Sequence, residues 1–271
     1  MPATPWRVVV LTSIPPVAIG YAELIRACGH EPVAVIAPRR AAQGATQFVE
    51  AVPKGMDVLF AESRGSLARM LRGYDADLAV CTGFPWLIPA EAIEAVPQGI
   101  VNGHPSPLPR YRGPFPIAWQ VRNGETEIGM TYHLMDAKFD TGNLLAQGSA
   151  PLDPEETMES LIPKLEGLSV ELLPKALARL AAGDRGDAQS GGDYQSAADL
   201  ADYVLVDLTQ TAADVHRQVR AWSFVPPVPP ERGPLLDGRR LLKTSLTEVE
   251  GAERLECSDG PLWVVESETA A

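Results

Sequence analysis

Residues 7–38, RVVVLTSIPPVAIGYAELIRACGHEPVAVIAP, hold the pattern that decides the fold. The β-branched run over 7–12 predicts a short buried strand, and the apolar spacing over 18–29 predicts a helix that ends at a glycine. A second β-branched run, over 31–38, follows at once. A strand, a helix and another strand in this order indicate an α/β protein built on a parallel sheet.

The same alternation continues as far as residue 104. Further strands are predicted over 56–60, 77–83 and 99–104, with helices over 65–74 and 89–96 between them. These strands are continuous apolar runs, which are typical of strands covered on both faces. We therefore predict a doubly wound parallel sheet. Residues 39–55 fit either a helix or a mobile loop, and periodicity does not decide between them.

Two more strands are predicted over 128–135 and 142–152, and residues 154–182 then show helical spacing. Pro163 and Pro174 interrupt that spacing. Because proline removes a backbone donor and clashes with the preceding turn, we expect two helices or one kinked helix.

A change of composition to Gly, Asp, Ser and Gln predicts a linker over 184–204. It would divide a large α/β domain at 1–183 from a small C-terminal domain at 205–271. The small domain is expected to hold a helix over 211–222, a stiff Pro-rich loop over 225–234 and two or three short strands. It is too short for an independent barrel, so we expect a truncated OB-like, β-rich subdomain.

The bulk composition excludes several classes of protein. The 271 residues carry a net charge of −12, which argues against non-specific nucleic-acid binding through clustered Lys and Arg. Cys28, Cys81 and Cys257 are widely spaced, so we expect a reducing compartment with neither a disulfide framework nor a metal site. No apolar run reaches the length of a membrane span, and we expect a cytoplasmic protein with no membrane partner.

Common nucleotide-binding and hydrolase signatures are missing from the sequence. The first predicted strand leads into LTSIPPVAIG (11–20), which has neither of the glycine patterns that cradle phosphates, so no nucleotide cofactor is expected there. No GxSxG turn is present, and Ser106 lies between two prolines. Both observations argue against a serine nucleophile.

Polar side chains instead follow the fifth predicted strand. IVNGHPSPLPRYRG (100–113) delivers Asn102 and His104 at the end of that strand, and open parallel sheets bind ligands beyond the carboxyl ends of their strands. Downstream, the turn-forming stretch MDAKFDTG supplies Asp136 and Asp140. An amide donor, an imidazole and a carboxylate at one place suit acyl transfer, which needs a stabilised oxyanion and a moved proton.

Two stretches resemble the family of formyltransferases that use 10-formyltetrahydrofolate. They are NGHPSPLPRYRGPFPIAW (102–119) and NGETEIGMTYHLMDAKFDTG (123–142), and a looser likeness extends over 5–185. The resemblance implies a Rossmann-like catalytic domain with 10-formyltetrahydrofolate as co-substrate. It also implies that Asn102, His104 and Asp140 form the catalytic trio.

A folate pocket is implied by the same resemblance. Its expected members are Phe84, Pro85, Trp86, Leu87 and Ile88, whose backbone would bind the pterin, together with the turn Ser106-Pro107-Leu108-Pro109 and Asp136. Pro107 departs from the family, which usually has leucine there, and TSIPP (12–16) replaces the Gly-Thr-Pro of the tRNA-formylating branch. Arg110 and Arg112 either clamp an anionic acceptor or the folate tail, or are merely solvated.

The trio implies a mechanism in which a neutral amine attacks the formyl carbon. The side chain of Asn102 and a protonated His104 would stabilise the oxyanion, one such donor contributing about 3–4 kcal/mol. Asp140 would raise the pKa of His104 and, with a water molecule, pass the proton to the departing nitrogen. His133 and His216 are expected to be structural or exposed, although His133 is near enough to touch the acceptor.

The formyl acceptor stays open between several interpretations. A small-molecule amine, either an amino sugar or an amino acid derivative, is favoured because the region that would grip tRNA is short and acidic here. Formylation of methionyl-tRNA and hydrolysis of formyltetrahydrofolate are the alternatives. The intact trio disfavours a non-catalytic folate-binding protein. We also consider a homodimer formed through the C-terminal part.

Overall fold

The computed structural model describes residues 4–197, 199, 204–225 and 233–270. The chain divides into two compact units. The first comprises Met1–Pro109, Gly129–Ser149 and Lys164–Gly191, and the second comprises Arg110–Ile128, Ala150–Pro163 and Gly192–Ala271. The predicted division into a domain, a linker and a small domain stays a prediction. Residues 198, 200–203 and 226–232 of the expected linker and Pro-rich loop lie outside the described residues.

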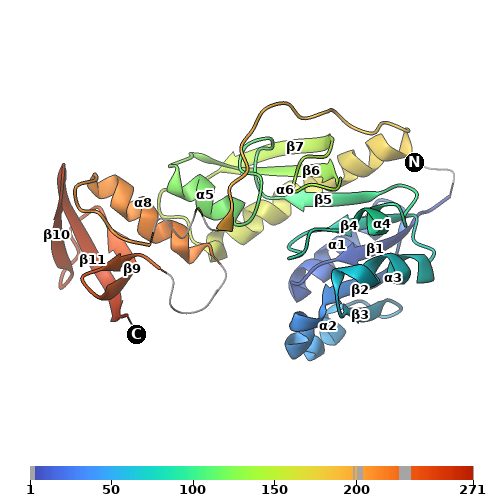
Figure 1. Ribbon diagram of the computed structural model, residues 1–271, viewed down its shortest axis with the longest axis horizontal. Coiled ribbons are helices and arrows are strands. Elements are labelled where there is room, and N and C mark those ends of the chain that lie inside the picture. Colours follow the sequence, from blue (N-terminus) through green and yellow to red (C-terminus); the bar gives the residue numbers. More distant parts are fainter. Residues whose placement is uncertain (1–3, 198, 200–203, 226–232, 271) are drawn as a thin grey trace. The chain divides into compact units, whose positions relative to one another are not determined.

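A seven-stranded sheet forms the centre of the first unit (Figure 1). Its spatial order is β3 (Asp57–Ala61), β2 (Glu31–Pro38), β1 (Arg7–Leu11), β4 (Leu78–Cys81), β5 (Ile100–His104), β6 (Glu127–Leu134) and β7 (Leu144–Pro151). Neighbouring strands from β3 to β5 are parallel, and β6 runs antiparallel to β5. The predicted doubly wound α/β fold is confirmed, and β6 makes the sheet mixed.

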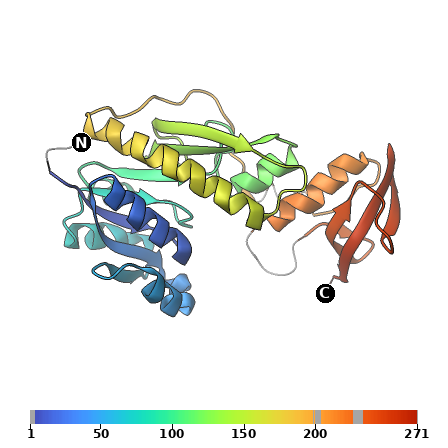
Figure 2. The same cartoon turned by 180° about the vertical axis from the view of Figure 1, so that it is seen from behind.

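Helices cover both faces of this sheet (Figures 1 and 2). α1 (Pro15–Ala27) and α6 (Met158–Ala181) lie on one face, and α3 (Leu67–Gly73) and α4 (Ala90–Ile93) lie on the other. On the second face, Leu67 and Leu71 join the strand residues Val9 and Leu11 in one buried cluster. Both faces of the strands are therefore buried, which explains why their sequences are continuous apolar runs.

Two regions settle points that the sequence left open. Residues 39–55 hold a 3-10 turn at Arg39–Gly44 and the helix α2 (Ala45–Ala51). α6 is one continuous helix, so of the two expected alternatives the single helix is right and the pair of helices is wrong. Pro174 leaves the Val170 carbonyl without its helical donor, but Val170 is 57% exposed and water can bond that carbonyl.

The strand order fixes where a ligand is expected. From β1 the chain adds β2 and β3 on one side, and it then adds β4 and the later strands on the other side of β1. Open α/β sheets bind ligands at such a switch point, outside the carboxyl ends of the strands. The hydroxyl of Ser13 donates to the carbonyl of Gly83 at 2.6 Å and joins the loops that leave these two strands. β5 is the next strand along, with Asn102 in register with Cys81 at the end of β4.

The second unit contains α5 (Pro116–Arg122), α8 (Ala212–Ser223) and a four-stranded antiparallel sheet. The order of that sheet is β10 (Glu253–Cys257), β11 (Gly260–Thr269), β9 (Arg239–Ser245) and β8 (Leu235–Leu236). The predicted β-rich part is confirmed, although it has four strands rather than two or three. Val219 of α8 packs against Leu241 and Val264 of the sheet. No helix within the described parts of the chain is both long and apolar enough to cross a membrane.

Candidate active site

Strands β5 and β6 bring four polar side chains to one face of the sheet. Asn102 and His104 are two residues apart on β5, so their side chains project from the same face. The antiparallel register pairs Asn102 with His133 and His104 with Thr131. His104, His133 and Thr131 are buried, with at most 6% of their surfaces exposed. A polar patch therefore lies inside an otherwise apolar sheet.

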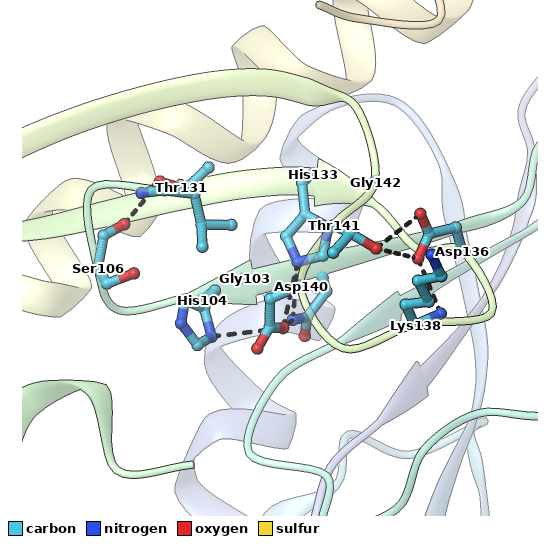
Figure 3. Close-up of polar contacts among 12 residues, drawn as sticks. Gly103, His104, Ser106, Thr131, His133, Asp136, Lys138, Asp140, Thr141 and Gly142 are labelled. Atoms are coloured by element: carbon cyan, nitrogen blue, oxygen red, sulfur yellow. Dashed lines mark hydrogen bonds and ion pairs between the residues drawn. The ribbon is translucent and has the colours of Figure 1, made fainter. Parts of the chain in front are cut away.

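Asp140 completes this patch from the loop that joins β6 to β7. Its Oδ1 atom lies 3.6 Å from Nδ1 of His104 and 3.6 Å from Nε2 of His133, and the side-chain amide of Asn102 donates to it at 3.5 Å (Figure 3). Asp140 is itself only 8% exposed. The structure thus brings together the three residues that the sequence analysis singled out, and it adds His133.

His133 has a defined pattern of hydrogen bonds. Its Nδ1 lies 3.0 Å from the carbonyl of Leu134, and a carbonyl can only accept, so Nδ1 carries the proton. In the neutral ring Nε2 is then an acceptor, and Nδ2 of Asn102 donates to it at 3.1 Å. His133 therefore orients the amide of Asn102, which agrees with the expected structural role, and it is buried rather than exposed.

A sequence signal for His133 exists. In the alternating stretch IGMTYHLM (128–135), apolar Met130, Tyr132 and Leu134 occupy one face of the strand and polar Thr131 and His133 occupy the other. Only the register with β5 shows that this polar face meets Asn102 and His104.

Burial and the nearby carboxylate also act on Cys81, the neighbour of Asn102 in β4. Burial, and then the charge of Asp140, raise the pKa of the Cys81 thiol far above its ordinary value. The thiol stays protonated at neutral pH, so Cys81 is a packing residue and not a nucleophile. Among the described residues, no group of three or more His, Cys, Asp or Glu side chains is placed to hold a metal ion.

The loop that carries Asp140 depends on an unusual backbone. Asp140 has a φ of 56°, in the left-handed region, and Gly142 follows where an added Cβ would lie 1.7 Å from the carbonyl oxygen of Leu134. The Asp136 carboxylate accepts from the backbone N–H of Lys138 at 3.0 Å and from the Thr141 hydroxyl at 2.7 and 2.8 Å (Figure 3). Asp136 therefore shapes this loop, and its predicted part in a folate pocket stays a prediction.

The proline-rich turn after β5 is fastened to β6 and β7. Thr131 donates its hydroxyl hydrogen to the carbonyl of Ser106 at 2.6 Å and accepts the backbone N–H of Leu108 at 3.2 Å. The side-chain amide of Gln147 donates to the Leu108 carbonyl at 2.7 Å. An added Cβ at Gly129 would lie 2.3 Å from the nitrogen of Pro107. Thr131, Gln147 and Gly129 were not among the site residues expected from the sequence.

These contacts place the predicted pocket residues of the turn and of the stretch after β4. Ser106 and Leu108 are buried, whereas Pro107 and Pro109 are half-buried. After β4, Ile88 is buried in the core and the rings of Phe84 and Trp86 meet edge to face, 5.4 Å apart, partly buried against the same core. Pro85 is exposed and Leu87 half-buried. Their part in folate binding stays a prediction.

Arg110 and Arg112 belong to the second unit. Nη1 of Arg110 lies 3.1 Å from Oε1 of Glu125, and Nη2 donates to Oε2 of the same carboxylate at 3.2 Å. Glu125 also accepts from the hydroxyl of Tyr111. The backbone of Arg112 accepts the N–H of Gln195 at 2.9 Å. The charge of Arg110 is thus shared with Glu125, and acceptor binding by either arginine stays a prediction.

The comparisons with known proteins agree with this geometry. A family model described as formyl transferase matches residues 30–177, more than half of the chain. The chain belongs to the formyl transferase family. Methionyl-tRNA formyltransferase of Trichlorobacter lovleyi is 39% identical over 159 residues, which are 58% of this chain and 50% of that protein. The match therefore spans about half the length of this relative.

Sugar-modifying members of the formyl transferase family are also similar to this chain. GDP-perosamine N-formyltransferase of Brucella melitensis is 35% identical over 157 residues, covering 58% of this chain and 60% of that protein. The solved N-formyltransferase of Helicobacter canadensis, in complex with folinic acid and dTDP-3-aminofucose, superposes with a TM-score of 0.69 and 18% identity. That superposition covers 97% of this chain and all of the other, so the two share a fold along almost their whole length.

Proposed function

We propose that this protein transfers the formyl group of 10-formyltetrahydrofolate to an amine of a small acceptor. The observation that carries the proposal is that Asn102 Nδ2 and His104 Nδ1 lie 3.5 and 3.6 Å from the same oxygen of Asp140, in a member of the formyl transferase family. An amide donor, an imidazole and a carboxylate are the groups that acyl transfer to an amine requires.

Each member of the trio has a distinct task in this reaction. The N–H of Asn102 that faces Asp140 at 3.5 Å turns to the oxygen that becomes negative as the amine attacks, while the other N–H stays on His133. His104 holds a proton at the same place, and Asp140 faces its Nδ1 at 3.6 Å. Because these groups are buried or half-buried, hydrogen bonds to a developing charge are stronger here than in water.

Two groups of residues are proposed to hold the folate. When bound, 10-formyltetrahydrofolate supplies the activated formyl carbon. The half-buried rings of Phe84 and Trp86 offer an apolar wall after β4, and the turn at 105–109 is held by Thr131 and Gln147. Preformed walls of this kind reduce the entropy lost on binding. The Helicobacter canadensis enzyme, which shares the fold, was crystallised with folinic acid.

A small acceptor is favoured by the charges of the C-terminal part. Residues 205–271 contain seven Lys and Arg against eleven Asp and Glu. The arginines of its sheet already have partners: Arg239 pairs with Glu253, Arg240 with Glu268, and Arg254 with Glu256. A surface that grips the phosphates of tRNA needs cations that are not neutralised in this way. The sugar-nucleotide acceptors named for two similar enzymes fit the same preference.

Formylation of methionyl-tRNA is the second candidate. It is supported by the 39% identity to the Trichlorobacter lovleyi enzyme, which exceeds the identity to the sugar enzymes named above. Because that match covers only half of the relative, it does not by itself carry the relative's acceptor over to this chain.

The experiment follows the release of tetrahydrofolate from 10-formyltetrahydrofolate under separate conditions. The protein is incubated with no acceptor, with charged initiator tRNA, with amino-sugar nucleotides and with amino acids. We expect release to depend on a small amine and to yield its N-formyl product. Release that requires tRNA would support the second candidate, and equal release without any acceptor would identify a hydrolase.

A further inference from the structure

The backbone of the turn that carries Asp140 is held from outside its own loop by Gln189. The side-chain amide of Gln189 donates to the carbonyl of Asp140 at 2.9 Å and to the carbonyl of Gly142 at 2.7 Å. These two carbonyls flank Thr141, so a single amide with two N–H groups bridges both sides of the turn. Gln189 lies far along the chain, in the stretch from which the sequence predicts only a linker.

The turn needs such a bridge because its backbone is strained. The left-handed conformation of Asp140 is disfavoured for a residue with a Cβ relative to the right-handed one. A conformation of this kind persists only where surrounding contacts over-determine it. Inside the loop the Asp136 carboxylate supplies three contacts, and Gln189 supplies two from outside.

Gln189 is itself anchored by the chain on its N-terminal side. Asp187 and Leu144 exchange two backbone hydrogen bonds, of 2.8 and 2.9 Å, which add a bridge to the start of β7. Gly186 precedes this bridge with a φ of 81°, and an added Cβ there would lie 2.5 Å from the carbonyl oxygen of Leu144. Within this stretch Ala188 and Ser190 are exposed, whereas Gln189 is half-buried. Its side chain is therefore directed at the loop by a fixed backbone.

We infer that Gln189 is a positioning residue for the reaction: it fixes the Asp140 carboxylate against His104 and His133 without touching the substrate. This inference rests on the proposed function and adds a residue to it. Loss of the two hydrogen bonds frees the Asp140 turn, and a displacement of about 1 Å in a reacting group can lower a rate by up to about 100-fold. The turn predicted to bind folate is held separately by Thr131 and Gln147, and Asp136 keeps its own contacts with Lys138 and Thr141, so KM for the folate is expected to change less than kcat.

The test compares Gln189→Leu and Gln189→Glu with a matched control. Gln189→Glu keeps the shape of the side chain but turns a carboxylate toward two carbonyl oxygens, so it removes both donors. Asn143→Ala is the control, because the Asn143 side chain donates to the carbonyls of Arg185 and Gly186 in the same stretch and forms no hydrogen bond with Asp140 or Gly142. Both Gln189 variants are expected to lower kcat about tenfold with KM for the folate within twofold, whereas Asn143→Ala stays near the wild type.

A second readout does not depend on activity. The chain has four histidines, so ¹⁵N-histidine labelling of the full protein gives a simple imidazole spectrum that single His→Gln variants assign. In Gln189→Leu the signals of His104 and His133 should move, because Asp140 Oδ1 lies 3.6 Å from a ring nitrogen of each, and those of His30 and His216 should not. Unchanged His104 and His133 signals, or equal movement in Asn143→Ala, would overturn the inference. If the protein transfers no formyl group, the spectra still decide on Gln189 while the proposed function fails.

Discussion

Replacement of Asn102 by alanine should have two separable effects, one on the reaction and one on the fold. Asn102 supplies the amide proposed to donate to the oxyanion, and removal of one such donor typically lowers kcat by about 10²–10³. The same amide donates to Nε2 of His133, which is 1% exposed. A buried acceptor that loses its donor costs about 1–3 kcal/mol of stability. Since 1 kcal/mol corresponds to about 2–4 °C for domains of about 150–250 residues, Tm should fall by a few degrees.

The two effects are measured on the same preparations, as kcat for formyl transfer well below Tm and as Tm by calorimetry. Asn102→Asp is the isosteric comparison. It removes the donors and places a second carboxylate where the Asn102 amide lies, 3.5 Å from Asp140 Oδ1, so its kcat should fall at least as far. Asn143→Ala removes an amide of the same type from the same unit, 3.2 Å from the Arg185 carbonyl, and should leave kcat unchanged. If Asn102→Ala keeps kcat within threefold of the wild type, the reasoning about the oxyanion is refuted.

Three further predictions concern the loop, a helix cap and pH. Gly142→Ala should abolish most activity and lower Tm, measured by the same two assays, because its Cβ would lie 1.7 Å from the Leu134 carbonyl. Thr211→Ala should cost about 1 kcal/mol in urea unfolding, since it removes the acceptor for the Asp214 N–H at the start of α8. Burial lowers the pKa of His216, although Glu155 acts in the opposite direction. As the pH falls, His216 therefore takes up a proton at a higher pH in the unfolded chain than in the folded protein. This contribution of His216 to the free energy of unfolding should therefore be fully present above about pH 6.5 and should be lost as the pH falls. His216→Asn should make the free energy of unfolding less dependent on pH, measured by urea unfolding at pH 5.5 and 7.5.

Most of the fold could be predicted because it is encoded locally. The strand–helix–strand pattern of 7–38 appears in the structure as β1, α1 and β2, with ends that differ by three residues or fewer. α6 shows where local rules fail. The rule that proline breaks a helix assumes that the freed carbonyl has no other partner, and Val170 lies at an exposed position where water can serve. The exposure of Val170 depends on what the helix packs against, so the local sequence does not predict it.

The sequence predicts the trio of the candidate site, but it does not predict the residues that position the trio. Asn102 and His104 share a strand face by their two-residue spacing alone. His133 joins them only through the β5–β6 register, and Gln189 only through a contact across 49 positions of the chain. Gln189 cannot be recognised in the sequence, because a glutamine that bonds two carbonyls looks there like any other polar residue of a loop. Its role becomes visible only with the coordinates of both partners.

The antiparallel direction of β6 determines the path of the loop that carries Asp140, and few contacts hold that loop. Because β6 is antiparallel to β5, the loop 135–143 starts beside the amino end of β5 and must return along the face of the sheet to reach His104. Here nine residues suffice, and their shape rests on Asp136, Gly142 and Gln189. The apolar core of the sheet does not include these contacts, so replacement of Asp136 or Gln189 should lower kcat far more than it lowers Tm.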